Sequence, residues 1–68
     1  MTELQEQGLE AVAKLKDLAT ELFPLSARAY MQWVKAKARH YHNPQLAFAF
    51  VGAQITRLER QKLNGGIA

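Results

Sequence analysis

The side chains that could do chemistry here are mainly carboxylates, because the chain has no cysteine and only two histidines. Five carboxylates fall within the first 22 residues: Glu3, Glu6, Glu10, Asp17 and Glu21. A carboxylate pair works in acid–base catalysis where an apolar wall raises the pKa of one member. At about 100° per residue these five share the polar side of one helix, away from such a wall. We therefore expect a solvated face and no enzyme activity.

The hydroxyl and imidazole groups offer no alternative site. No histidine–acid pattern of an activated nucleophile accompanies the serine and threonine residues, which are Thr2, Thr20, Ser26 and Thr56. His40 and His42 point about 200° apart on a helix, and zinc needs more ligands than these two. No glycine-rich loop precedes a helix to hold a phosphate. The sequence therefore predicts no catalytic residue, no metal site, no cofactor and no small-molecule substrate.

Basic residues form a more definite pattern. Residues 1–22 carry five acids and two bases, net −3, whereas residues 23–68 carry seven bases and one acid, net +6. One flank of the second predicted helix forms a basic ridge of Arg28, Lys35, Arg39 and His42. Its fixed cations span about 16 Å, enough to meet two or three phosphates, and His42 joins when protonated. If exposed, Trp33 and Tyr41 would stack on the bases of a single strand.

Other interpretations of these patterns stay open or are disfavoured. The ridge is also typical of an ordinary solvated helix face. A major-groove reader is disfavoured, because only Gln45 is polar at the start of the third helix. The longest apolar run, 46–53, is far too short for a membrane span, so we expect no membrane partner. The polar, acidic first residues predict no secretory signal, and we expect a cytoplasmic protein.

Three amphipathic helices must position these residues, at about 3–22, 27–42 and 44–63. Capping residues precede each of them: Thr2, Ser26 and Asn43. Phe23-Pro24 ends the first helix, and Asn43-Pro44 starts the third. Asn64-Gly65-Gly66 is a glycine pattern typical of a helix end, so we expect residues 65–68 to fray. Short links between the helices predict antiparallel or steeply crossed neighbours.

The apolar positions of each helix fall on one side and predict a shared core. They are Leu4, Gly8, Ala11, Val12, Leu15, Leu18, Ala19 and Leu22, then Ala27, Tyr30, Met31, Val34, Ala38 and Tyr41, then Phe48, Val51, Ile55 and Leu58. The fold class is thus an all-α domain of three helices that comprises residues 1–68.

The third helix carries a second apolar stripe with a basic rim: Leu46, Ala49, Phe50, Ala53, Arg57 and Arg60. Because residues 46–53 are apolar all round, they should be covered on both sides. The stripe is typical of an interface core with a charged rim, although it could also pack within the same chain. Burial of apolar surface and conformational entropy, each about 100 kcal/mol, nearly balance in so small a chain. We therefore expect a homo-oligomer, with a dimer through the third helix favoured.

Two functions remain for such a chain. The first is a non-catalytic protein-interaction module, an adaptor, inhibitor or regulator, that works through the stripe of the third helix. The second is a nucleic-acid-binding regulator that uses Arg28, Lys35, Arg39, Arg57 and Arg60 on phosphates. In either case the expected partner of the basic residues is a protein or nucleic acid with an acidic surface.

Overall fold

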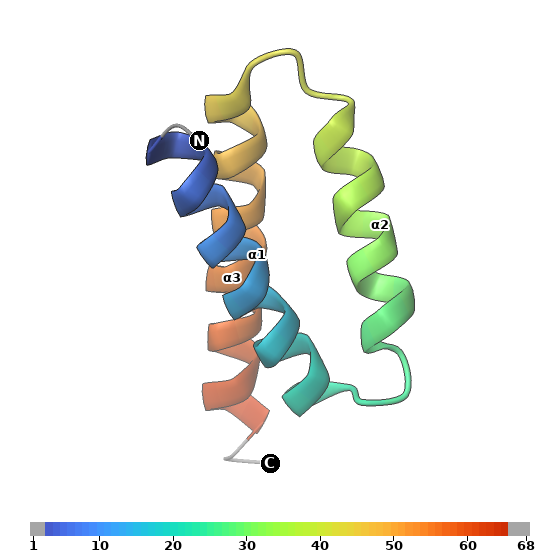
Figure 1. Cartoon of the computed structure of the whole chain (residues 1–68). Coiled ribbons are helices and arrows are strands. Elements are labelled where there is room, and N and C mark those ends of the chain that lie inside the picture. Colours follow the sequence, from blue (N-terminus) through green and yellow to red (C-terminus); the bar gives the residue numbers. More distant parts are fainter. Residues whose placement is uncertain (1–2, 66–68) are drawn as a thin grey trace.

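The structure, a computed structural model, describes residues 3–65. It consists of three α-helices, α1 (Glu3–Leu22), α2 (Ala27–Arg39) and α3 (Pro44–Gly65), and these residues form no strand. The predicted all-α, three-helix fold is confirmed. Figure 1 shows α1 and α3 running in the same direction and crossing at a shallow angle, with α2 antiparallel to both. The molecule is elongated, about 40 × 20 × 17 Å.

The core is small and lies where the three apolar stripes meet. Its buried members are Leu15, Leu18, Ala19, Ala27, Met31, Val34, Val51 and Leu58. Leu15 and Val34 are fully buried, and both come from the middle of a predicted stripe. Every buried residue belongs to those stripes, whereas Phe23 and Phe50, which also pack against the core, do not. The side chain of Leu4 lies outside the described part of the structure.

Two of the predicted helix boundaries are confirmed with their mechanism. α1 ends at Leu22, where Phe23-Pro24 follows, and the Phe23 N–H still donates to the Ala19 carbonyl at 2.9 Å. Asn43 caps α3, because its side-chain oxygen accepts a 2.8 Å hydrogen bond from the Gln45 N–H. Pro44 occupies the first helical position, where its missing N–H costs nothing. The proposed cap at Thr2 falls outside the described residues.

Other boundary predictions were wrong. α2 ends at Arg39 rather than 42, because the chain needs residues 40–43 to reverse its direction before α3. His40 and Tyr41 instead donate to the carbonyls three residues earlier, at 3.1 and 3.3 Å, which tightens the last turn. Ser26 occupies the predicted cap position, but its side chain makes no capping hydrogen bond.

The end of α3 also differs from the prediction. The helix runs through Gly65, and no described glycine has the positive φ that a left-handed cap requires. Gly65 is thus helical rather than frayed, whereas residues 66–68 lie outside the described range.

Candidate functional site

The outward face of α3 points away from the core and is largely apolar. We define it by Leu46, Ala49, Ala53, Arg57 and Arg60, all of which are exposed, with the Arg57 side chain at the edge of the face nearest α2. Leu46 is 55% exposed, although it belongs to the run expected to be covered on both sides. Within the chain that expectation is wrong, because only the inner side of this run is packed.

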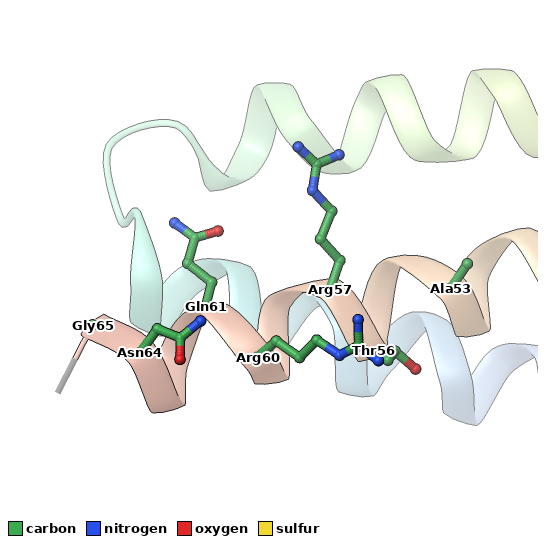
Figure 2. Close-up of a pocket in the computed structure, with 7 residues that line it drawn as sticks. All are labelled: Ala53, Thr56, Arg57, Arg60, Gln61, Asn64 and Gly65. Atoms are coloured by element: carbon green, nitrogen blue, oxygen red, sulfur yellow. The ribbon is translucent and has the colours of Figure 1, made fainter. Parts of the chain in front are cut away.

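The basic end of this face forms a shallow, open depression of about 590 Å³. Figure 2 shows Arg57 projecting from α3 toward α2, whereas Arg60 runs along α3 toward Thr56. The Thr56 hydroxyl donates to the Gly52 carbonyl at 3.1 Å and so lies flat on the helix. Between Pro44 and Thr56 the helix has no charged residue. The face is therefore smooth and uncharged along its first half and cationic along its second.

Phe50 belongs to a different surface from the rest of the predicted stripe. It is half-buried, and its ring lies 5.8 Å from Trp33 and 5.8 Å from Tyr41. Tyr30 extends this row, 6.0 Å from Trp33 and 5.5 Å from Phe23. The five rings form an aromatic row that joins α2 to α3, so Phe50 already has partners inside the chain.

The aromatic row carries polar groups at both ends of α2. The Lys37 ammonium lies 5.2 Å from the Trp33 ring centre and 5.4 Å from that of Phe50, within cation–π range. The Tyr30 hydroxyl donates to Gln54 Oε1 at 2.8 Å. Burial raises the pKa of Tyr30 above its ordinary 10.0, an effect that the nearby Arg57 charge partly offsets. Trp33 is 47% exposed, and exposure is what stacking on a nucleic-acid base requires.

Three of the four residues of the predicted basic ridge lie on α2. Arg28 and Lys35 lie exposed on the flank of α2 that faces α1, and Arg39 is exposed one turn beyond Lys35. His42 follows the end of α2, so its placement on the ridge, which assumed a continuous helix, was wrong. Lys16 of α1 joins Arg28 and Lys35 around one depression of about 440 Å³. We call Lys16, Arg28, Lys35 and Arg39 the basic surface.

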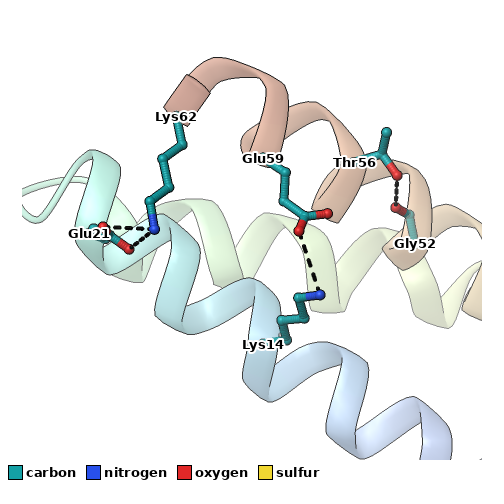
Figure 3. Close-up of polar contacts among 6 residues, drawn as sticks. All are labelled: Lys14, Glu21, Gly52, Thr56, Glu59 and Lys62. Atoms are coloured by element: carbon teal, nitrogen blue, oxygen red, sulfur yellow. Dashed lines mark hydrogen bonds and ion pairs between the residues drawn. The ribbon is translucent and has the colours of Figure 1, made fainter. Parts of the chain in front are cut away.

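The carboxylates lie elsewhere. Glu21 pairs with Lys62 at 3.0 Å and Glu59 with Lys14 at 3.6 Å, and both pairs join α1 to α3 (Figure 3). All six carboxylates are exposed, and no three acid or histidine side chains within residues 3–65 gather to hold a metal ion. α2 contains four cations and no acid. The ion pairs therefore leave the basic surface unneutralised.

Sequence reasoning missed Lys16 and the aromatic row. Each rests on two helices coming together, and periodicity within one helix carries no information on which flanks become neighbours. Only Lys16, spaced about two turns before the predicted helix end, could have been suspected from its position on the edge of the apolar stripe.

Comparison with known proteins gives no further guide. No family model, curated protein or solved structure matches this chain. None of the described helices is long and apolar enough to cross a membrane.

Proposed function

We propose that this chain is a non-catalytic interaction protein, and that it acts as a homodimer joined through the outward face of α3. One observation carries the dimer. The chain exposes 5283 Å², whereas a compact monomer of this mass exposes about 4,300 Å². The excess of about 1,000 Å² is similar to the roughly 800 Å² that each partner buries in a standard interface.

The outward face of α3 suits a second copy better than the other outer faces do. A two-fold interface sets each patch against itself, so like charges within the patch repel. The outer side of α1 carries acids, and α2 carries only cations. The α3 face is uncharged from Pro44 to Thr56, and Ala49 and Ala53 permit the close approach of two helices, about 8 Å between axes.

The arginines at the end of the face favour an antiparallel pair. In a parallel pair Arg57 would meet Arg57 of the partner subunit. In an antiparallel pair centred between Ala49 and Ala53, the two Arg57 side chains begin about 18 Å apart along the axis. That separation exceeds the Debye length of about 8 Å at physiological salt, so their repulsion is screened.

Such a dimer would present α1 and α2 to other molecules. The acidic side of α1 and the basic surface would both remain on the outside, in two copies related by symmetry. This arrangement matches the role of an adaptor or regulator that occupies a partner's surface, with no reaction of its own.

Sedimentation of the wild-type chain and of Ala53→Glu tests the dimer. We expect wild-type dimers at micromolar concentration, and a dissociation constant at least about 100-fold higher for Ala53→Glu, because the dimer would bring two carboxylates into its apolar centre. Ala36→Glu is the matched control, since Ala36 is an exposed alanine on α2 and the same charge there should leave assembly unchanged. The proposal would be contradicted if the wild type is a monomer, or if both variants sediment like the wild type.

A further inference from the structure

We propose that the basic surface binds the phosphate backbone of a nucleic acid. The inference names the partner of the proposed interaction role, but it does not need the dimer, because each chain carries the whole surface. It rests on four cations that two helices bring to one side: Lys16 from α1, and Arg28, Lys35 and Arg39 from α2.

These cations are available to a ligand. In the described part of the chain the ion pairs are those of Lys14 and Lys62, which lie between α1 and α3. The acids of α1 occupy its other side, and no acid lines the depression between α1 and α2. Potentials from unpaired like charges add, so this side of the molecule attracts polyanions.

The spacing of the cations fits a linear polyanion. Arg28 and Lys35 are two helical turns apart, about 10 Å, and Arg39 extends the row to about 16 Å. The phosphates of a strand rise by about 3.4 Å per nucleotide and wind around the axis, so a straight row of this length meets two or three of them.

The remaining lining favours phosphate over a protein partner. Gln32 and Thr20 stand between the cations, whereas the apolar lining residues Ala27 and Met31 are buried. Arginine, lysine, glutamine and threonine are the side chains that contact phosphate oxygens. Pro24 is the exposed apolar residue of this lining, and a protein interface would need a larger apolar or aromatic centre than one proline.

The test is fluorescence anisotropy with labelled duplex and single-stranded oligonucleotides of mixed sequence, titrated from about 50 to 200 mM salt. Four duplex phosphate contacts predict a slope of log affinity against log salt of about −3.6, hence a loss of about 150-fold over that range. Arg28→Ala/Lys35→Ala should halve the slope, because two contacts disappear. Lys14→Ala/Lys62→Ala is the matched control, with the same loss of net charge from cations that are already paired.

Binding of either strand type with the slope halved only in Arg28→Ala/Lys35→Ala supports the proposal. No binding at the lower salt overturns it, as does an equal loss in both variants, which would report net charge alone. If poly-glutamate at the same charge concentration displaces the labelled oligonucleotide from the protein, the partner of this surface would be an acidic protein instead. Sedimentation of each variant without nucleic acid keeps a failure of the dimer separate from a failure of this surface.

Discussion

At the scale of single residues, the two helix caps differ in a way that the sequence conceals. Asn43 and Ser26 are both favoured cap residues, yet only Asn43 uses its side chain, to accept from the Gln45 N–H at 2.8 Å. Ser26 contributes only its carbonyl, which accepts from the Tyr30 N–H at 2.9 Å. A cap residue stabilises a helix through its side-chain hydrogen bond, so the two should differ in energetic weight.

Replacement of each cap by alanine tests this difference. Asn43→Ala should lower the free energy of unfolding by about 1 kcal/mol, because the Gln45 N–H loses its acceptor. Ser26→Ala removes no side-chain hydrogen bond and should change stability by less than about 0.5 kcal/mol. Urea unfolding of both variants at one protein concentration measures the difference. Equal losses would contradict the expected difference between the two caps.

Residue-level pairing was the part of the structure least accessible from the sequence. Glu10 and Lys14 have the spacing of a favourable pair on one helix, but Lys14 instead reaches Glu59, and Lys62 reaches Glu21. Both observed pairs depend on α1 and α3 lying side by side. Exposed pairs of this kind contribute about 0–1 kcal/mol each, so they follow the packing of the helices and do not determine it.

At the scale of the elements, Tyr30 is the polar link between α2 and α3. Its hydroxyl donates to Gln54 Oε1, and its ring stands between Phe23 and Trp33 in the aromatic row. No ion pair within residues 3–65 joins α2 to another helix. The position of α2 therefore depends on its three buried residues and on this row.

Tyr30→Phe should weaken the attachment of α2 and change the response to alkaline pH. At neutral pH we expect a loss of about 0.5–1.5 kcal/mol, because the hydrogen bond to Gln54 disappears. Burial raises the pKa of Tyr30 in the folded chain, so its contribution is complete below about pH 10 and is lost as the pH rises through the folded value. The free energy of unfolding, measured with urea from pH 8 to 11, should fall more steeply for the wild type than for Tyr30→Phe. Parallel profiles would show that the phenol is not buried in solution.

The elements were largely predictable and the relations between them were not. Three helices, the core stripes and the stop at Phe23-Pro24 follow from periodicity and from proline geometry, which act within one segment. The early end of α2 follows from the need to reverse the chain before α3, and the loss of His42 from the ridge follows from that end. Phe50 matched the outward stripe by spacing, yet its large ring reaches around α3 to Trp33, whereas Ala49 and Ala53 stay outside.

At the scale of the whole molecule, an elongated shape and a small core leave surface that a second chain would cover. One such surface is an apolar hollow of about 520 Å³ at the end where the N-terminal half of α1 meets α3, and it is lined by uncharged residues that include Gly8, Leu9 and Phe48. The other is the outward face of α3, which is uncharged along its first half. The proposed dimer is placed on α3 because Ala49 and Ala53 permit the close approach of a second helix there.

The antiparallel orientation can be tested with single cysteines, because the natural chain has none and an introduced thiol finds a partner only in another molecule. In the proposed register Ala49 lies opposite Ala53 of the partner subunit, whereas identical residues are offset by about 6 Å along the axis. Identical residues then lie near the limit of about 7 Å between Cα atoms that a disulfide tolerates, whereas Ala49 and Ala53 of the partner subunit are directly opposed, so a mixture of Ala49→Cys and Ala53→Cys chains should form mixed disulfides in excess of the statistical share. A parallel pair would instead join identical chains. Oxidation under equilibrium exchange, followed by mass spectrometry of the linked species, shows which chains are joined and so decides between the two orientations. We expect the antiparallel one, because it keeps the Arg57 charges of the two chains apart.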